Sequence, residues 1–384
     1  MRVRLLPPVP FSVDNRRLKT VLQVIKSHHL DGFIVTNPIN IFYLSEFRGI
    51  SQTERESILI FCPSPVFLTA SLYQNEAGKV AGKNLKVKIV PQSYLIHQKA
   101  ASLLKNCRRI GFEENNLTFH EYQYFRKALG DKLAPKNNLI ENLRVTKTED
   151  EIKKIEKAQI ISQKAFEKLL KTVKIGQTED EIAEKLAQVI KSLGGQDLAF
   201  ESIIASGPNS AVPHHVTGRR KIKKGDILLF DFGAKYQNYC ADLSRTIFLG
   251  RAGDRQRNIF NHVLTTQQKA IAKIESGTKS PDAYHAALDH FKKHRLHRNF
   301  LHGLGHGIGI EVHEAPYLRP FDSAQGHGLK PKTTDEEILT EGMVFSVEPG
   351  LYFSWGGIRI EDLVTIANGK AKVLGKTVTE IIEI

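Results

Sequence analysis

Asp226-Ile-Leu-Leu-Phe-Asp-Phe-Gly233 and Tyr239-Cys-Ala-Asp-Leu-Ser-Arg-Thr-Ile-Phe248 are the two stretches that decide the fold of this chain. Each contains an apolar run typical of a buried strand, and an aspartate interrupts each run, Asp231 in the first and Asp242 in the second. A hairpin that turns midway between them, after Tyr236, would place the two aspartates directly opposite each other, with Cβ atoms roughly 4.5–5.5 Å apart. Like charges repel in that position. The sequence therefore predicts a positive group between them, and a metal ion is the simplest candidate.

A second pair of acids follows the same pattern. Glu348 ends the apolar run Met343-Val-Phe-Ser-Val-Glu348, and Glu361 lies inside the apolar run 358–364. Between the two acid pairs lies His302-Gly-Leu-Gly-His306-Gly-Ile-Gly-Ile-Glu-Val-His313-Glu. Glycine at every second position there predicts extended backbone with one bare face, which lets another group approach closely.

Four carboxylates and one imidazole emerge as candidate metal ligands: Asp231, Asp242, His306, Glu348 and Glu361. Such a mainly oxygen site suits two divalent ions such as Mn²⁺, and Zn²⁺, Co²⁺ or Fe²⁺ would also be accepted. The alternative is that the acids form salt bridges at strand ends. Because unpaired buried carboxylates are costly, four acids in two apolar hairpins favour the metal site.

Composition and charge limit the class of protein. A chain of 384 residues exceeds the usual single core, so we expect two domains. No apolar run approaches the ~18 residues of a membrane span. The net charge of +14 raises the question of nucleic-acid binding. However, Lys and Arg are scattered, and the densest cluster, 219–224, is typical of an exposed turn before a strand. We therefore expect neither a nucleic-acid nor a membrane partner.

The cysteines predict the compartment. Cys62, Cys107 and Cys240 are odd in number, lack C-x-x-C spacing and lie in or beside apolar runs. This usage is typical of reduced, buried thiols in a cytoplasmic protein.

The order of predicted elements indicates an N-terminal α/β domain over 1–143 and a second domain over 144–384. In the first, strands near 32–35, 57–61, 66–69, 87–90 and 110–112 alternate with helices near 15–28, 72–82 and 94–106. In the second, capping boxes begin two helices, strands follow, and the order then recurs with helices from about 255 to 275 and from Ser280-Pro281 to about 294. Two related halves around one sheet are predicted, each with one acid pair. Residues 317–340 are predicted to form a surface loop.

At these residues the chain resembles the Xaa-Pro peptidases (prolidase and aminopeptidase P) among the pita-bread-fold metallopeptidases. The resemblance covers nearly the whole chain and is carried by specific motifs: Asp-Phe-Gly around Asp231, Asp242-Leu-Ser-Arg-Thr, Gly305-His-Gly-Ile-Gly with His313-Glu-Ala-Pro316, Glu348-Pro-Gly-Leu-Tyr352, Gly357-Ile-Arg-Ile-Glu-Asp362 and, more weakly, Asn40-Ile-Phe-Tyr-Leu-Ser-Glu-Phe47. It implies an α+β protein with a C-terminal pita-bread domain of pseudo-two-fold halves and a smaller, creatinase-type α/β N-terminal domain. It also implies a homodimer, in which the N-terminal domain or the partner limits substrate access.

The resemblance assigns roles to the ligands. Two metal ions roughly 3.5–4 Å apart would bridge and activate one water. We expect Asp231 to be bidentate on one ion, Asp242 and Glu361 to bridge, and His306 and Glu348 to complete the other. Glu348 would also take the proton of the attacking water.

Four further residues are candidates for the catalytic site. The resemblance places His313 and His214 beside the scissile carbonyl and amine, where they could stabilise the oxyanion or pass a proton. His302 is a third histidine candidate, with a structural role as the alternative. Arg359 could orient Asp242 or a substrate carboxylate, or neutralise excess acid across the strands. His215 and Cys240 are expected to be a loop residue and a small buried hydrophobe.

The predicted reaction is hydrolysis of the bond between an N-terminal residue and proline, with proline-containing peptides as substrates. Proline has no amide N–H, so a pocket built around its ring would be useful. The sequence leaves open whether the substrate is a dipeptide or longer. Two alternatives also remain: a methionine aminopeptidase of the same fold, and a non-enzymatic protein that binds a polyanion.

Overall fold

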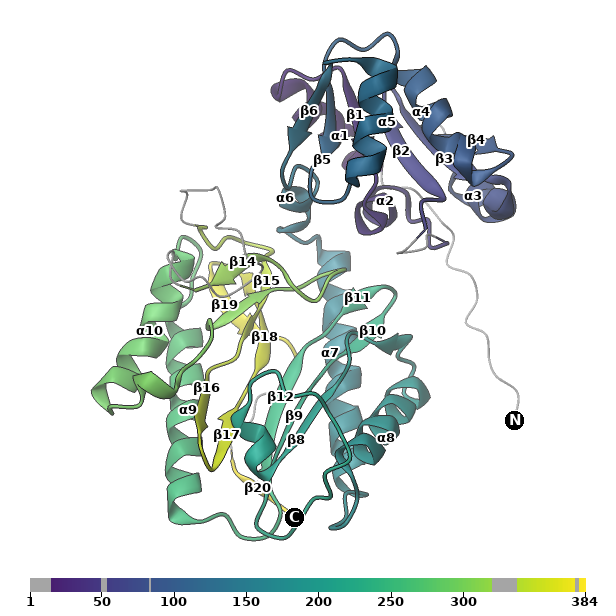
Figure 1. Ribbon diagram of the computed structural model, residues 1–384. Helices are drawn as coiled ribbons and strands as arrows, with labels where there is room; N and C mark the ends of the chain where they lie inside the picture. Colours follow the sequence, from purple (N-terminus) through teal and green to yellow (C-terminus); the bar gives the residue numbers. More distant parts are fainter. Residues whose placement is uncertain (1–14, 50–53, 83, 320–336, 377–379) are drawn as a thin grey trace. The chain divides into compact units, whose positions relative to one another are not determined.

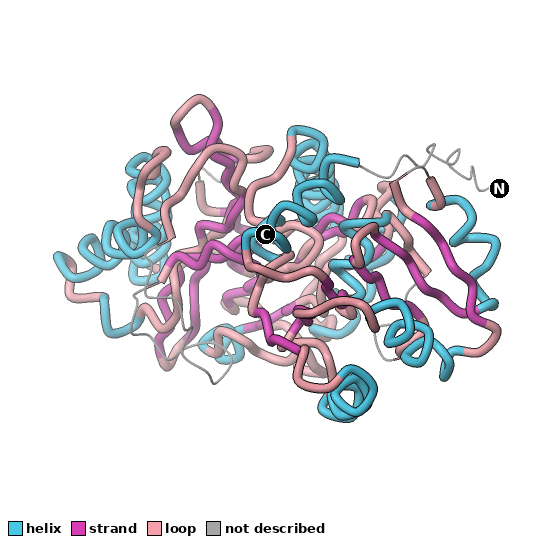
Figure 2. Tube along the Cα trace, turned by 90° about the horizontal axis from the view of Figure 1, so that it is seen from above, coloured by secondary structure: helices cyan, strands magenta, loops and turns pink. Residues whose placement is uncertain are grey.

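The computed structural model describes residues 15–49, 54–82, 84–319, 337–376 and 380–384. The chain divides into two compact units, Met1–Leu143 and Arg144–Ile384. In each unit the strands run through the interior and the helices lie along the outside (Figure 2). Among the described residues, every helix is too short or too polar to cross a membrane.

The N-terminal unit contains a six-stranded mixed sheet with the order β4-β3-β2-β1-β5-β6 (Figure 1). Its strands are β1 (Gly32–Val35), β2 (Ser57–Phe61), β3 (Pro65–Ala70), β4 (Lys86–Val90), β5 (Ile110–Glu113) and β6 (Leu133–Lys136). Its helices are α1 (Asn15–Ser27), α2 (Pro38–Ser45), α3 (Gln74–Val80), α4 (Ile96–Leu104) and α5 (Phe119–Leu129), with α6 (Glu141–Arg144) at the boundary between the units. All residues of β1, β2 and β3 are buried. Both faces of the central strands are therefore covered, as the α/β prediction requires.

Among the elements of this unit that the sequence patterns missed, three have a clear physical reason. β6 is an edge strand with no fully buried residue, so it lacks the apolar run of a central strand. α2 is only 8 residues long, and it begins at Pro38 after Asn37, whose side chain accepts a hydrogen bond from the Ile39 N–H. α5 buries only Glu121, Phe125 and Leu129, and its Thr118 capping box is the local signal that could have revealed it.

The expectation of three reduced thiols is wrong for two of them. Cys62 and Cys107 form a disulfide that joins positions 45 residues apart. Cys240 is a free, buried thiol. The cytoplasmic location was inferred from reduced cysteines, and it stays a prediction.

The C-terminal unit contains two helix pairs with strands between them (Figure 1). The first pair is α7 (Glu149–Leu170) and α8 (Glu179–Ser192), and the second is α9 (Asp254–Lys273) and α10 (Ser280–Lys293). The predicted capping boxes at Thr148 and Thr178 are confirmed. Ser280 is the first residue of α10 and not its cap, because Lys279 occupies the N-cap position.

Two main sheets belong to the two halves of this unit. The first has the order β20-β12-β9-β8 and the second β14-β13-β15-β18-β19. The strands of the first half are β7 (Asp197–Leu198), β8 (Ile203–Ser206), β9 (Ile227–Phe232), β10 (Ala234–Tyr236), β11 (Tyr239–Cys240) and β12 (Leu243–Phe248). The remaining strands are β13 (Gly305–Gly307), β14 (Glu314–Leu318), β15 (Val344–Val347), β16 (Gly350–Phe353), β17 (Gly356–Arg359), β18 (Asp362–Ala367), β19 (Lys370–Val373) and β20 (Ile382–Glu383). The predicted repetition of helix, helix and strand pair is confirmed. The prediction of one sheet shared by both halves is wrong, because the strands of the two halves form separate sheets.

Short 3₁₀ helices complete the described elements: Ser71–Tyr73, Ser93–Leu95, Gly207–Ala211 and His297–Asn299. In the predicted surface loop 317–340, residues 320–336 lie outside the described residues. The prediction is wrong for its two ends, because Leu318 belongs to β14 and Leu339 is fully buried.

The register of the first hairpin differs from the predicted one. Asp231 pairs with Ser244, not with Asp242, because the turn is centred on Gln237 and Asn238, both of which have positive φ. Two residues with positive φ form the turn type that suits a two-residue hairpin. Since the register shifts by two positions, Asp242 stays on the same face as Asp231 and lies diagonal to it.

The two halves of the unit meet at β12. The Glu361 N–H donates to the Ser244 carbonyl at 3.1 Å. The Thr246 hydroxyl donates to the Arg359 carbonyl at 2.9 Å and accepts from the Arg359 N–H at 3.1 Å. These bonds fix the acid pair of one half against that of the other.

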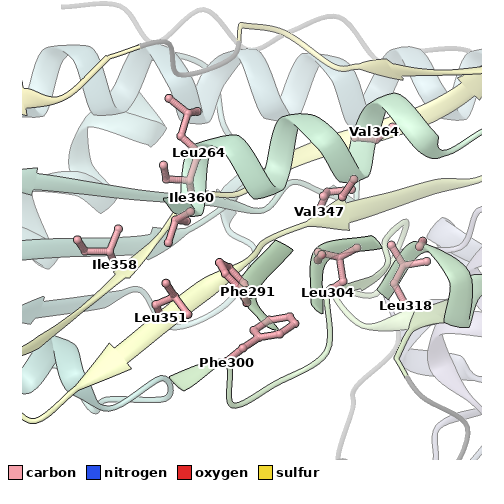
Figure 3. Packing of buried hydrophobic residues seen from close by; sticks show 14 of the residues in the cluster. Leu264, Phe291, Phe300, Leu304, Leu318, Val347, Leu351, Ile358, Ile360 and Val364 are labelled. Atoms are coloured by element: carbon pink, nitrogen blue, oxygen red, sulfur yellow. The ribbon is translucent and has the colours of Figure 1, made fainter. Parts of the chain in front are cut away.

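An apolar core packs against the strands of the second half of the C-terminal unit. It joins α9 and α10 to the strands through buried side chains (Figure 3), among them Leu264, Phe291, Val347, Ile360 and Val364. Val347 and Ile360 each precede one of the two candidate glutamates. Their burial therefore anchors the backbone on which Glu348 and Glu361 stand.

Glycines on β13 allow its neighbours to approach closely. A Cβ at Gly305 would lie 2.0 Å from the Ser346 carbonyl oxygen, and one at Gly307 would lie 2.1 Å from the Ala315 carbonyl oxygen. The predicted face without side chains is therefore present on β13, and the backbone of neighbouring strands packs directly against it. This contact sets the position of His306, which lies between the two glycines.

Replacing Gly305 by alanine should lower the free energy of unfolding by about 1–3 kcal/mol, because backbone must move to admit the methyl group. Urea unfolding followed by the fluorescence of Trp355, the sole tryptophan, would measure it. Gly218→Ala is the control, since its Cβ would meet only the Val216 carbonyl oxygen at 3.9 Å. Equal midpoints for the two variants would contradict the prediction.

The N-terminal unit should lose stability as the pH rises, because of Glu113. Burial and the charge of Glu141 raise the pKa of Glu113 from 4.5 to about 7. The folded protein therefore holds a proton that the unfolded chain releases above pH 4.5, and stability falls as the pH rises through 7. Glu141→Gln should reduce this loss, whereas Glu114→Gln, at an exposed position, should not. Hydrogen–deuterium exchange of the β1 peptide, corrected for the intrinsic rate, would show no difference between the variants if the prediction fails.

Candidate active site

The five predicted metal ligands come together where the two halves of the C-terminal unit meet. Asp231 lies on β9 and Asp242 directly precedes β12. His306 is the central residue of β13, Glu348 follows β15, and Glu361 precedes β18. Because Val347 pairs with Asp362 and Gly350 with Arg359, Glu348 and Glu361 are directly opposite in register.

Distances within the cluster fit a shared cation. Asp242, His306 and Glu361 each offer one ligand atom, and these atoms lie within 4.8 Å of one another. His306 Nε2 lies 3.3 Å from Glu348 Oε1 and 3.7 Å from Asp242 Oδ2. Asp231 interacts with both Asp242 and Glu348. All five predicted ligands therefore belong to one group of interacting side chains.

Burial and mutual repulsion make the acids costly to ionise. Burial, followed by the charges of Glu361 and Asp231, raises the pKa of Asp242 well above its ordinary value. Burial and the charge of Glu348 do the same to the pKa of Glu361. The pKa of Asp231 is also raised, mainly by burial. The cluster therefore needs additional positive charge to hold its carboxylates ionised at neutral pH.

Two carboxylate oxygens of the cluster are available to bind a metal ion. Asp242 Oδ1 and Glu361 Oε1 are buried and have no hydrogen-bond partner. The other Glu361 oxygen accepts from Ser244 Oγ at 2.8 Å. Unpartnered buried carboxylate oxygens are rare and costly, and both of these lie in the cluster with His306. The residues present fit divalent cations.

His306 and Glu348 form an ion pair inside the cluster. Burial would lower the pKa of His306, but Glu348 outweighs it and raises that pKa to about 9. Burial would raise the pKa of Glu348, but the hydrogen bond and charge of His306 lower it to about 2. In the metal-free protein a proton on His306 thus supplies the positive charge that a metal ion would supply. Metal binding would displace this proton, because a ligating imidazole must be neutral.

Arg359 is the positive group that the chain itself supplies. Its Nη2 lies 2.5 Å from Asp231 Oδ2, its Nε donates to Ser244 Oγ at 2.8 Å, and its Nη1 donates to the Pro213 carbonyl at 3.1 Å. Nη1 also donates to the Tyr352 hydroxyl at 2.7 Å. Arg359 pairs with Asp231 and not with Asp242. This contact agrees with the interpretation that Arg359 neutralises excess acid, and orientation of a substrate carboxylate stays a prediction.

The three other histidine candidates differ in their surroundings. His302 Nε2 contacts the Tyr352 hydroxyl at 2.9 Å, and burial lowers the pKa of His302 to about 4. The ring of His313 is exposed, with its centroid 4.2 Å from that of His306. His214 is exposed and follows Pro213, whose carbonyl is bound to Arg359. His313 and His214 are therefore at the edge of the cluster, and His302 reaches it through Tyr352.

Comparison with known proteins agrees with this geometry. Residues 153–368 match metallopeptidase family M24, and residues 17–146 match the creatinase/prolidase N-terminal domain. The chain belongs to metallopeptidase family M24. The Xaa-Pro dipeptidase of Pyrococcus furiosus is 32% identical over 369 residues, which are 95% of this chain and 99% of that protein.

Two solved structures are similar to this chain over nearly its whole length. The Xaa-Pro dipeptidase from Bacillus anthracis has a TM-score of 0.87 and 29% identity, with 96% of this chain and 99% of that chain covered. The X-Pro aminopeptidase from Thermotoga maritima has a TM-score of 0.82 and 29% identity, with 95% and 99% covered. The expected fold, a pita-bread domain preceded by a creatinase-type domain, is confirmed.

His215 and Cys240 have structural roles, as the sequence predicted. His215 Nε2 lies 2.9 Å from Glu179 Oε2, and Glu179 is a fully buried carboxylate that also accepts from Ser206 and Asn209. Burial raises the pKa of Cys240 to about 12. His215 fixes its loop to α8, and Cys240 is an inert buried thiol.

Sequence reasoning missed the hydroxyl groups that orient the ligands. Ser244 Oγ donates to Glu361 and accepts from Arg359. Ser346 Oγ accepts from the His306 N–H at 3.1 Å and donates to Glu348 at 3.0 Å. Tyr352 links His302 to Arg359. A hydroxyl inside an otherwise apolar strand was the available signal, because a buried hydroxyl needs a partner.

A second arginine holds the backbone behind the site. Arg245 donates to the Glu361 carbonyl and to Asp362 Oδ1, the latter at 2.6 Å. The other Asp362 oxygen accepts from Gln267 Nε2 on α9 at 3.1 Å. This network ties β12 to β18 and to α9.

Replacing Arg359 by methionine should destabilise the metal-free protein at pH 8 by about 3 kcal/mol, because it leaves the half-buried Asp231 without its cation. Arg359→Lys should recover part of the loss, since lysine keeps the charge but not the planar set of donors. Urea unfolding followed by Trp355 fluorescence would measure both. Arg298→Met, at an exposed position, is the control, and equal losses in the two methionine variants would contradict the prediction.

Proposed function

We propose that this M24 protein is a dinuclear-metal Xaa-Pro peptidase, which hydrolyses the bond between an N-terminal residue and proline. The observation that carries the proposal is the cluster of Asp242, His306 and Glu361, with its unpartnered buried carboxylate oxygens. Relatives of similar length named Xaa-Pro dipeptidase support the substrate class.

Asp231, Asp242, His306, Glu348 and Glu361 would hold two divalent ions. Mn²⁺ suits this oxygen-rich set, and Co²⁺, Zn²⁺ and Fe²⁺ are alternatives. Such ions would supply Lewis acidity and a nucleophilic water at neutral pH. Because cations attract the carboxylates and displace the proton from His306, binding should raise the unfolding midpoint.

The chain's own residues would move the protons. Glu348 is held in place by Ser346 Oγ at 3.0 Å, and it would accept the proton of the attacking water and pass it to the proline nitrogen. His313 and His214, at the edge of the cluster, would donate hydrogen bonds to the carbonyl oxygen and the substrate amide region. His302 and Arg359 would act as positioning residues, since His302 reaches the cluster only through Tyr352, and Arg359 holds the ligand Asp231.

Substrate choice would follow from proline itself. A peptidase that recognises an amide N–H at that position cannot bind proline, so a site shaped around the ring would favour it. We also propose that the N-terminal unit, or a partner in a homodimer, limits the length of the peptide. The similarity to both an Xaa-Pro dipeptidase and an X-Pro aminopeptidase leaves this length to experiment.

Peptide release tests the proposal. Metal-stripped protein would be assayed before and after Mn²⁺ addition on Ala-Pro, Ala-Pro-Ala and Met-Ala-Ser. We expect Mn²⁺-dependent release of alanine before proline. Cleavage of the dipeptide alone would indicate a prolidase, and cleavage of the tripeptide alone an aminopeptidase P.

Matched variants make this assay specific. Glu348→Ala should lose at least about 10²-fold in kcat/KM, as expected for a general base, whereas Glu167→Ala, at an exposed site on α7, should not change it. Cleavage of Met-Ala-Ser alone would favour a methionine aminopeptidase. No release from any peptide with Mn²⁺, Co²⁺ or Zn²⁺ would refute the proposal and favour polyanion binding by the basic chain.

A further inference from the structure

Three histidines gather where α9 and the C-terminal end of α10 lie together, on elements other than those that carry the carboxylate cluster. His262 belongs to α9, His290 to α10, and His294 is the C-cap of α10. Each offers one ring nitrogen, and these nitrogens lie within 4.8 Å of one another. His262 and His290 are half-buried and His294 is exposed, so solvent reaches the group.

The spacing of two of these nitrogens matches metal ligation. His262 Nδ1 lies 3.3 Å from His290 Nε2. Two ligands at zinc–nitrogen bond lengths of about 2.0–2.1 Å in a tetrahedron are separated by roughly 3.3–3.4 Å. The third ring is close to both, with centroid distances of 4.3 Å from His262 to His294 and 4.7 Å from His290 to His294.

The helix pair fixes these positions without a metal. Val263 and Phe291, the neighbours of His262 and His290, are fully buried in the apolar core. Figure 3 shows Phe291 and Leu264 within that core. His290 and His294 are four residues apart, so they lie on the same side of the helical turn. Little conformational entropy would therefore be lost on binding.

We propose that His262, His290 and His294 form a separate surface site for one borderline divalent ion, with Zn²⁺ or Cu²⁺ as its ligand. Three neutral imidazoles favour these ions over Mn²⁺, Mg²⁺ and Ca²⁺, which prefer oxygen. A fourth position stays open to water. The ion would link α9 to the end of α10, behind the strands that carry Glu348 and Glu361.

Lys269 would compete with such an ion, because it contacts the ring of His290. Its Nζ lies 3.3 Å from His290 Nδ1, and an ammonium can only donate, so His290 Nδ1 accepts and Nε2 carries the hydrogen. Ligation through Nε2 requires the other tautomer and displaces Lys269. Burial, Lys269, His294 and His262 lower the pKa of His290 to about 4, which keeps this ring neutral at neutral pH.

Zinc binding to the metal-stripped, full-length protein tests the proposal. In equilibrium dialysis, His290→Ala and His294→Ala should each bind one equivalent of Zn²⁺ fewer than the wild type. His285→Ala, an exposed histidine on the same helix, should bind as many as the wild type. Lys269→Gln should tighten the additional site, by about tenfold, whereas Lys273→Gln on the same helix should not.

Cu²⁺ electron paramagnetic resonance separates this site from the carboxylate cluster. Three imidazoles should give multiple nitrogen couplings, whereas the carboxylate cluster offers only His306. We expect His294→Ala, which leaves two of the three imidazoles, to lose nitrogen couplings from this signal, whereas His285→Ala should keep them. Equal Zn²⁺ stoichiometry in His290→Ala, His294→Ala and His285→Ala, or no multi-nitrogen signal in the wild type, would overturn the proposal. Neither readout requires peptidase activity.

Discussion

Repulsion among buried carboxylates is the constraint on which the C-terminal unit depends. Asp231, Asp242, Glu348 and Glu361 converge in a region with little access to water, and the pKa of three of them is raised. Arg359 offsets part of this charge by pairing with Asp231, and His306 offsets part by pairing with Glu348. Asp242 Oδ1 and Glu361 Oε1 remain without a hydrogen-bond partner. The carboxylate cluster therefore needs bound cations to be fully neutralised, and this is the site of the proposed reaction.

The same constraint explains why the two halves join as they do. Each half supplies one acid pair on neighbouring strands, and neither half alone surrounds a cation. β12 brings the pairs together through main-chain and hydroxyl hydrogen bonds from Ser244 and Thr246. Behind them, Arg245, Asp362 and Gln267 form a buried network. Ligand atoms held by strands on one side and a packed helix on the other lose little freedom when a metal binds.

Local signals in the sequence were reliable where one face of an element is buried or a helix is capped. Thr148 and Thr178 mark helix starts that the structure confirms, and the apolar runs around Asp231 and Glu361 are strands. α5 was missed in spite of its capping box. The other failures occurred where the signal is weak or not local. β6 is a half-exposed edge strand, and the Cys62–Cys107 disulfide joins residues 45 apart. Ser244, Ser346 and Tyr352 orient the site through partners that are distant in sequence.

The sequence by itself determined which residues could bind a metal, the order of the elements and the presence of two halves, because residue chemistry and hydrophobic period are local properties. Only the tertiary structure decided how the acids face each other. The turn at Gln237–Asn238 shifts the register of the first hairpin by two residues from the predicted one. Packing between the two halves places Arg359 beside Asp231 and not beside Asp242. The His262, His290 and His294 group likewise exists only because α9 and α10 pack side by side. Pairing of this kind depends on turn geometry and on packing between distant segments, which no single stretch of sequence encodes.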